Sequence, residues 1–294
     1  MVDFWIILTG ALVAGSCGFI GCFLILRRVA MLGDAISHAI LPGIVIAFLI
    51  SGDRGTLPML IGAIVFGLIC TVLIQSLRQT GVQVDAAISV TFTTLFAIGI
   101  ILVTLFTRQV DLDLDCVLFG EIAYVPWDTI TLFGTDLGPK AVWGIGAAFL
   151  FCLIMVTLFY KQLKITSFDP AMAAAIGIPV AAIHYLLMGM ISVTTVASFE
   201  SVGAILVVAM LIVPGATAYL LTDRLSVMLG LATLVGVVSS ILGYYLAVLL
   251  DANIAGCMTI IAGLLFVMAF LFSPKHGILT RKWIQRRVKA SLQS

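Results

Sequence analysis

The sequence contains little charge. Only 10% of its 294 residues are Asp, Glu, Lys or Arg, whereas soluble domains average about 25%. It has no GxxxxGK[ST] motif, since no lysine follows a glycine anywhere in the chain, and it has neither a GxSxG nor an HExxH motif. The first absence excludes ATP binding through a P-loop. Without the other two motifs, the sequence shows no recognisable catalytic residues of an intramembrane hydrolase or protease.

Cysteine and basic residues are also too sparse to define a site. The six cysteines show no CxxC spacing, so we expect small core residues and no disulfide framework. Outside the C-terminal tail no segment is both basic and aromatic, and nucleic-acid binding therefore has no support. The first apolar run lacks a basic n-region and a small-residue cleavage site, which favours a retained span over a removed signal peptide.

Apolar residues are abundant instead. They make up 62% of the chain and concentrate in runs long enough to cross a hydrocarbon core of about 30 Å. The candidate spans cover residues 4–26, 32–50, 56–77, 88–107, 141–160, 180–197, 200–221, 226–250 and 256–273. We therefore predict an all-α polytopic membrane protein of eight or nine helices, in which the seventh run, close behind the sixth, is either a full span or a shorter, re-entrant element.

Lysine and arginine predict the orientation of these spans. The tail, residues 274–294, is basic and carries no acid, so we expect it in the cytoplasm, after a permease domain that covers residues 1–273. Counting back along the spans puts further basic residues on the same side: Arg27, Arg28, Arg78, Lys161, Lys164 and Arg224. Residues 108–140, which are rich in acid, and the N-terminus are then predicted to lie outside.

Two ionisable residues interrupt the second apolar run. Asp34 and His38 are four positions apart, so on a helix they point to the same side. A carboxylate and an imidazole suit Mn²⁺, Zn²⁺ or Fe²⁺, and a second copy in a dimer would complete the ligand set. Pro42 and Gly43 are expected to break the helix, as occurs beside cavities. The alternative is a buried Asp–His hydrogen bond with a packing role only.

Glu200 is the other acid within an apolar region of the second half. It stands at the start of the seventh run, near the predicted outer face. A solvated helix cap and a gate or transient metal ligand are both open at this stage.

The segment from residue 164 to residue 180 is too long for a turn and too mixed for a span. Ser167 or Asp169 is predicted to cap a short helix with Pro170 at its first position. Gly177 and Pro179 end it. Such a helix, held between two spans, offers a surface to another protein, although an ordinary linker at the membrane face has the same pattern.

Four motifs in order resemble one family over nearly the whole chain: "RRVAMLGDAISHAILPGI", "SFDPAMAAAIGIPV", "VPGATAYLLTDRL" and "FLFSPKHGIL". Together they are similar to the permeases of manganese, zinc and iron ABC importers, with a fold of the type II importer kind. The stretch "LDLDCVLFGEIAYVPW" looks most like the manganese branch.

This resemblance implies partners and roles. It implies a permease dimer, either homomeric or with a related chain, in a bacterial plasma membrane, served by an extracellular solute-binding protein and two cytoplasmic ATPase subunits. Asp34 and His38 would line the path of a transported Mn²⁺, or of Zn²⁺ or Fe²⁺, with no permanently bound cofactor, whereas Glu200 has no secure counterpart in the family. Residues 167–177 match the helix that couples to the ATPase, and the residues carried over are Ser167, Phe168, Asp169, Pro170, Ala174 and Gly177.

Three other interpretations stay open from the sequence. A proton-coupled secondary transporter would use the same Asp34 and His38, but it commonly shows an internal repeat with paired broken helices, and we find no second copy of "GDAISHA". A permease for a metal chelate such as a siderophore would leave the pair structural. A membrane scaffold would not need the coupling-like segment.

Overall fold

The computed structural model describes residues 2–51, 56–106, 122–132, 135–273 and 277, and in these it is helical apart from one hairpin. The helices of the first half are α1 Val2–Leu26, α2 Met31–Ala39, α3 Leu41–Ser51, α4 Thr56–Gln79 and α5 Val84–Phe106. A 3-10 turn, Val125–Trp127, precedes the antiparallel strands β1 Thr129–Leu132 and β2 Thr135–Pro139. The remaining helices are α7 Lys140–Leu158, α8 Tyr160–Phe168, α9 Pro170–Ala175, α10 Val180–Leu221, α11 Leu225–Leu250 and α12 Ile254–Phe272.

The prediction of an all-α membrane protein is confirmed. Within the described residues, nine segments are long and apolar enough to cross a membrane. Helices are the expected solution because a helix satisfies its own backbone hydrogen bonds where no water is available. Many large apolar side chains of these helices are exposed on the isolated chain, including Ile101, Leu105 and Leu249, as suits contact with lipid.

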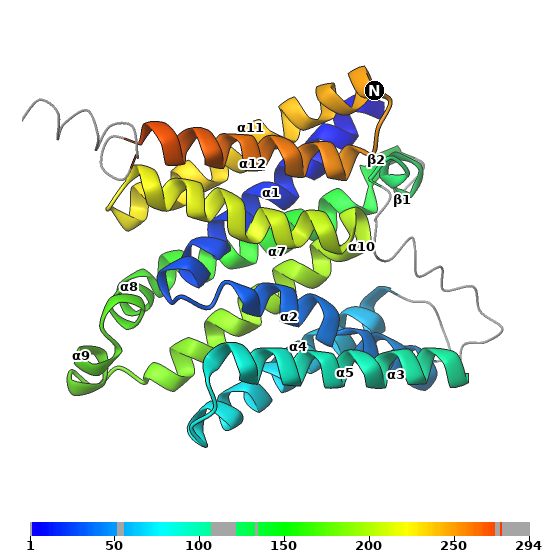
Figure 1. The fold of residues 1–294 in the computed structure, drawn as a ribbon. Helices are drawn as coiled ribbons and strands as arrows, with labels where there is room; N and C mark the ends of the chain where they lie inside the picture. Colours follow the sequence, from blue (N-terminus) through cyan, green and yellow to red (C-terminus); the bar gives the residue numbers. More distant parts are fainter. Residues whose placement is uncertain (1, 52–55, 107–121, 133–134, 274–276, 278–294) are drawn as a thin grey trace, which may run out of the picture.

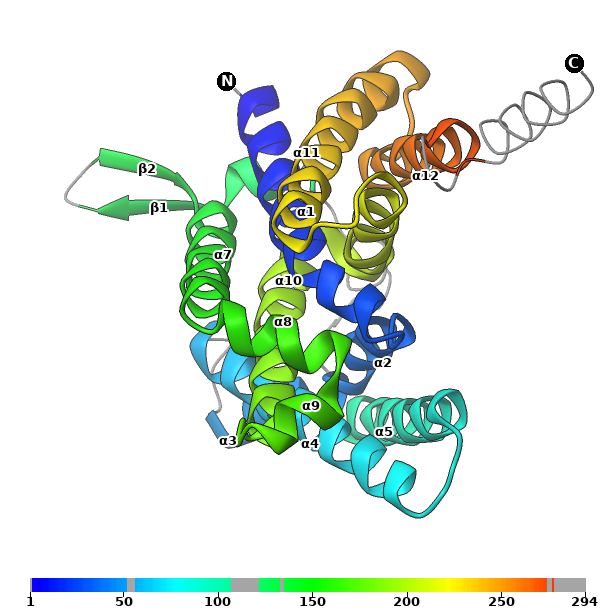
Figure 2. The ribbon, with the colours of Figure 1, turned by 90° about the vertical axis from the view of Figure 1, so that its left-hand side faces the viewer.

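The helices form two groups joined by α10. In one group α1 packs on α10 and α11, and α12 packs on both of the latter; in the other, α2 and α3 pack on α4 and α5. Helix α10 contacts members of both groups, among them α1, α12, α2 and α4. Within the second group, α2 lies on the side that faces the first group (Figures 1 and 2).

Helix α10 contains two spans, Val180–Phe199 and Ser201–Leu221. Near the start of the second, Gly203 has φ 77° and ψ 169°, a conformation outside the helical region. The chain reverses direction there (Figure 1). The second span has 21 residues, so the shorter, re-entrant element considered from the sequence is not what the structure shows.

The predicted break in the second span is also observed. Helix α2 ends at Ala39 and α3 begins at Leu41. Pro42 has no N–H, so the helical bond to the carbonyl of His38 cannot form, and the proline ring crowds that carbonyl. The ladder resumes where Ile44 N–H donates to the Ile40 carbonyl at 3.1 Å.

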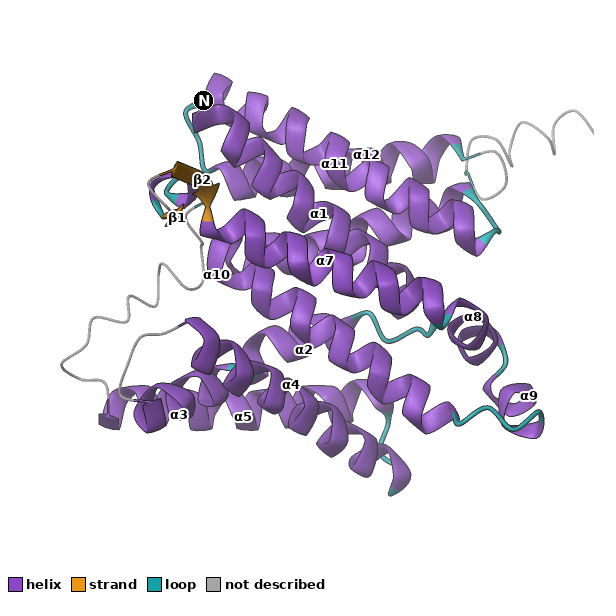
Figure 3. Cartoon of the chain, turned by 180° about the vertical axis from the view of Figure 1, so that it is seen from behind, coloured by secondary structure: helices purple, strands orange, loops and turns teal. Residues whose placement is uncertain are grey.

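The projecting helices and the β-hairpin lie at opposite ends of the molecule. Helices α8 and α9 project at one end, where α1 ends and the connection between α4 and α5 lies (Figures 1 and 3). The β-hairpin and the first residues of α1 lie at the opposite end. Asp111, Asp113, Asp115 and Glu121 of the acidic segment lie outside the described residues, as does the tail except for Gly277.

Small residues bring α1 close to its neighbours. A Cβ added at Gly21 would overlap the carbonyl oxygen of Leu211 on α10, and one added at Gly236 on α11 would come within 2.7 Å of the Ala14 carbonyl oxygen. Ser240 Oγ donates across this interface to the Gly10 carbonyl at 2.9 Å. Small residues allow such backbone approach between helices in membranes.

We predict that Gly21→Ala lowers the thermal stability of the purified chain. The added methyl group must push α1 away from α10, and overpacking of this kind costs about 1–3 kcal/mol. Gly144→Ala on α7 is the matched control, because an added Cβ there meets no atom within 4 Å. Melting in detergent, followed by intrinsic fluorescence, tests this, and equal midpoints for the two variants would contradict the close contact.

Candidate functional site

Asp34 and His38 lie together on the face of α2 that meets α5. Oδ1 of Asp34 and Nε2 of His38 are 3.5 Å apart, and the side chains are 37% and 24% exposed, respectively. The separation exceeds the 2.7–3.2 Å of ordinary N–H···O hydrogen bonds. This geometry differs from the closed, buried hydrogen bond of the packing interpretation, because both groups keep an open side that a ligand can reach.

Aromatic side chains of α5 hold the histidine ring. The ring centroid of His38 lies 5.3 Å from that of Phe96 in an edge arrangement, and 6.1 Å from that of Phe92. Ser37, between the two ionisable residues in sequence, is buried and turned back into the helix, where its hydroxyl donates to the Gly33 carbonyl at 2.9 Å. The Ser37 hydroxyl is therefore bonded within α2 and is not a third polar group beside Asp34 and His38.

The pair by itself is short of ligands. Ions such as Mn²⁺ and Zn²⁺ take four to six donors, and the described residues contain no group of three or more His, Cys, Asp or Glu that could hold such an ion. Glu200 belongs to α10, three residues before the Gly203 break, but its side chain lies outside the described part. Five buried cysteines are free and serve as small core residues.

The predicted short helix between residues 164 and 180 is present as α9. Of the two candidate caps, Asp169 takes the role: its Oδ1 accepts from the Met172 N–H at 2.9 Å. Pro170 occupies the first turn. Gly177 ends the helix with φ 84°, and its N–H donates to the Ala174 carbonyl at 3.1 Å.

Helix α9 and the residues that flank it carry exposed apolar side chains. Phe168, Met172 and Ile176 are exposed, whereas Ala173 is buried. Ala174 faces solvent as well. Figure 3 shows α8 and α9 projecting at one end of the molecule.

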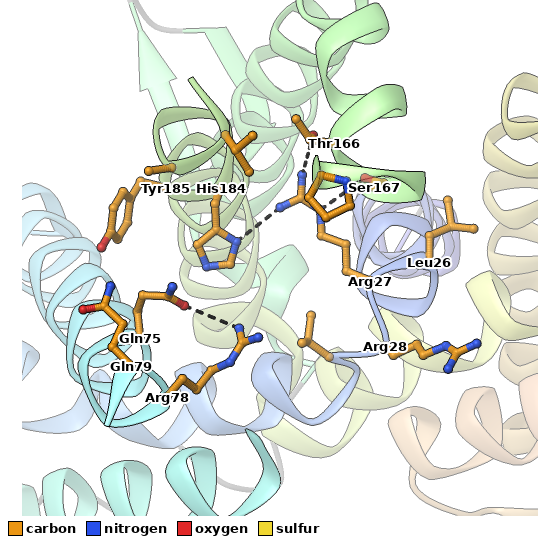
Figure 4. A pocket seen from close by; sticks show the side chains of 14 residues that line it. Leu26, Arg27, Arg28, Gln75, Arg78, Gln79, Thr166, Ser167, His184 and Tyr185 are labelled. Carbon is orange, nitrogen blue, oxygen red and sulfur yellow. Dashed lines mark hydrogen bonds between the residues drawn. The ribbon is translucent and has the colours of Figure 1, made fainter. Parts of the chain in front are cut away.

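Arg27 connects this projecting segment to the helix that bears the Asp–His pair. Its guanidinium donates to Thr166 Oγ1 at 2.9 Å and to Ser167 Oγ at 3.1 Å, at the end of α8. It lies 3.2 Å from His184 Nδ1 at the start of α10 (Figure 4). Burial lowers the pKa of Arg27 to about 10, which leaves the group charged at neutral pH.

In the sequence, Arg27 helps to orient the spans and opens the first of the four family motifs. Its position gives it a further role, since it follows α1 directly and precedes Asp34 by seven residues. Ser167, one of the two predicted caps, instead accepts a hydrogen bond from Arg27. No local pattern signals this contact, because its partners are about 140 residues away in the chain.

The nine apolar segments, the broken α2–α3 span with its ionisable pair and the projecting α8–α9 segment define a polytopic transport permease. The chain belongs to the ABC 3 transport family, whose pattern matches residues 2–273.

Known proteins are similar to this chain over almost its full length. The chain is 54% identical to the manganese transport system membrane protein MntD of Bacillus subtilis (strain 168), over 95% of this chain and 94% of that protein. It is 41% identical to the zinc transport system membrane protein TroD of Treponema pallidum (strain Nichols), over 98% and 78%. A solved structure of PsaBC from Streptococcus pneumoniae in complex with Fab matches with a TM-score of 0.79 and 34% identity, over 95% and 94%.

We predict that Arg27→Gln loosens the α8–α9 segment. The substitution removes the charge-assisted bonds to Thr166 and Ser167, each worth about 1.5–3 kcal/mol. Hydrogen exchange measured by mass spectrometry should show faster exchange across α8 and α9. Arg28→Gln is the control because the Arg28 side chain points away from these partners (Figure 4), and equal exchange in the two variants would refute the connection.

Proposed function

We propose that this chain is the permease subunit of a bacterial ABC importer for Mn²⁺, and that the ion passes between Asp34 and His38. Zn²⁺ and Fe²⁺ share these ligands and are the next candidates. The observation that carries the proposal is the half-open Asp–His pair, 3.5 Å apart, inside a segment long enough to span the membrane. Ionisable residues at such depth mark ion pathways by default.

The incomplete ligand set supports a dimer. Two donors from one chain become four when a second permease chain, either a copy or a related protein, brings an equivalent pair to a shared axis. Facing carboxylates repel each other when no ion is present, so a divalent cation stabilises their approach. The transported ion is the cargo, and we propose no permanently bound cofactor.

The choice of metal rests on ligand chemistry and on relatives. A carboxylate and an imidazole form the mixed oxygen and nitrogen set that suits Mn²⁺ and its neighbours. The relative with 54% identity is named for manganese transport and the one with 41% identity for zinc transport. Manganese is therefore the first ion to test.

Helix α9 is the proposed contact for the ATPase. Met172 on α9 and Phe168 at the end of α8 are exposed apolar side chains. They belong to the segment that projects at one end of the molecule (Figure 3), and Arg27, which bonds to Thr166 and Ser167 of α8, lies at the same end. We place this end in the cytoplasm, together with the basic tail, because basic residues favour that side. The chain lacks a P-loop, so ATP hydrolysis is assigned to separate subunits, and an extracellular binding protein delivers the ion.

Membership of an ABC transport family weighs against the proton-coupled secondary transporter. The chelate permease remains a distinct candidate, because it leaves Asp34 and His38 with a structural role only. The metal-ion importer and the chelate permease differ in two measurable respects. Only the ion importer transports the free ion, and only the ion importer requires Asp34 and His38 for transport.

We predict that Asp34→Asn and His38→Ala each reduce ATP-dependent uptake of ⁵⁴Mn²⁺ by at least about tenfold, in vesicles that hold the complete transporter. Loss of one close ligand removes 1.4 kcal/mol or more of ion stabilisation, which is a factor of ten. Asp85→Asn, an exposed carboxylate in the first turn of α5, is the control and should transport normally.

Assembly with the ATPase is measured for every variant, so that lost uptake is not confused with a lost complex. Undiminished uptake in both pair variants would return Asp34 and His38 to a structural role. Uptake driven by a proton gradient without ATP would favour the secondary transporter.

We predict that Ala174→Glu on α9 prevents co-purification of the ATPase subunit. A buried, unpaired carboxylate at an interface costs several kcal/mol, so both ATPase recovery and uptake should fall at least tenfold. Ala252→Glu makes the same change at an exposed position after α11 and should leave recovery unchanged. Normal assembly of the Ala174 variant would remove α9 from the interface.

A further inference from the structure

A cavity of about 510 Å³ opens between the ends of α1, α4, α8 and α10. Its lining is polar where the helices end: Arg27, Gln75, Arg78, Gln79, Thr166 and His184 all contribute. Figure 4 shows the side chains of Arg27, which follows α1, and of Arg78 on α4 directed toward the His184 ring. Arg28 also lines the cavity, but its side chain extends away from that ring. The cavity is thus a recess with two guanidinium groups aimed into it.

These two arginines lack a counter-charge. No Asp or Glu is among the residues that line the cavity. Arg27 bonds two hydroxyls and a histidine nitrogen, and Arg78 bonds the Gln75 amide oxygen at 3.4 Å. Neither forms an ion pair with a carboxylate in the described part of the chain. Arg27 is partly buried, whereas Arg78 is exposed. Two neighbouring cations without an anion favour an anionic ligand, and they disfavour a metal ion.

An apolar stripe leads away from the cavity along α4. Val65, Val72 and Gln79 are spaced by seven residues, so they share one face of the helix, and Gln75 lies on that face too. Val65 and Val72 are 46% exposed, as is appropriate for contact with an acyl chain, while Gln75 and Gln79 line the cavity. One helix face therefore offers apolar surface within the span and polar surface at its end.

We propose that this cavity binds the phosphate headgroup of an anionic glycerophospholipid, with an acyl chain along Val65 and Val72 on α4. Basic pockets between spans on the cytoplasmic side are suited to such headgroups, and bidentate guanidinium groups match phosphate oxygens. The assignment to the inner leaflet rests on the orientation given under the proposed function, whereas the cavity and its charges do not depend on it.

The apolar stripe distinguishes a lipid from free phosphate. A free anion would use Arg27 and Arg78 alone, whereas a lipid also needs the α4 face. The same stripe favours a lipid over an acidic group of the ATPase, which would have no use for the apolar face of α4. The bound headgroup would neutralise the charges around Arg27, and so would support the contact between α1 and α8.

The test is lipid titration of the purified full-length chain, followed by native mass spectrometry. Phosphatidylglycerol and phosphatidylcholine with identical acyl chains are compared. We expect phosphatidylglycerol to bind at least about fivefold more tightly, and Arg78→Gln to weaken it by about fivefold, the effect of one basic residue near an anionic lipid. Arg224→Gln, an exposed arginine in the α10–α11 connection outside the cavity, should have no effect.

Further variants separate the possible ligands. Val72→Ser should weaken phosphatidylglycerol binding, whereas Leu73→Ser, on another side of α4, should not. Gln79→Glu repeats the Arg78 test by adding a negative charge at the cavity, in case the Arg78 variant folds poorly. Inorganic phosphate should fail to displace the lipid at equal concentration.

Four outcomes would overturn the proposal. The first is equal binding of phosphatidylglycerol and phosphatidylcholine, and the second is an effect of Arg224→Gln on lipid binding as large as that of Arg78→Gln. The third is displacement of the lipid by inorganic phosphate together with unchanged lipid binding in Val72→Ser. The fourth is that Arg78→Gln loses co-purification of the ATPase while the original chain shows no preference between the two lipids. The readout contains no metal, so it stands or falls separately from metal uptake through Asp34 and His38.

Discussion

The hydrocarbon interior of a membrane supplies no hydrogen bonds, and the rest of this structure follows from that constraint. Each span satisfies its own backbone hydrogen bonds as a helix. Hydroxyl groups such as those of Ser37 and Thr194 donate hydrogen bonds to backbone carbonyls of the preceding turn. Where the ladder is interrupted, at Pro42 and at Gly203, an ionisable residue lies nearby in sequence. The polar groups that remain open to a ligand are therefore few, and Asp34 and His38 are prominent among them.

Coupling across the chain depends on how α2 is anchored. Arg27 holds the end of α1 to Thr166 and Ser167 of α8 and to His184 of α10, so the helix that carries Asp34 begins at a junction shared with the projecting α9 segment. The close α1–α10 contact at Gly21 gives this junction a rigid base.

Much of the fold was predictable because each signal was local. Apolar runs of span length, Pro42 after the Asp–His pair, and the Asp169–Pro170 start and Gly177 end of α9 each act through neighbouring backbone. The sequence placed the seventh run at residues 200–221 but left open whether it is a full span, since that depends on the backbone at Gly203 taking a positive φ. For the site, the four-residue spacing of Asp34 and His38 gave their common face but not their 3.5 Å separation or their exposure.

By itself, the sequence determined the membrane class, the nine apolar segments, the break after His38 and the absence of a P-loop, because composition and local backbone chemistry decide these. Only the tertiary structure decided the placement of the aromatic rings of α5 beside His38, the joining of Arg27 to α8, and the gathering of Arg27 and Arg78 around one cavity. Those contacts join residues far apart in the chain, and the close packing of helices that brings them together leaves no periodic trace in the sequence.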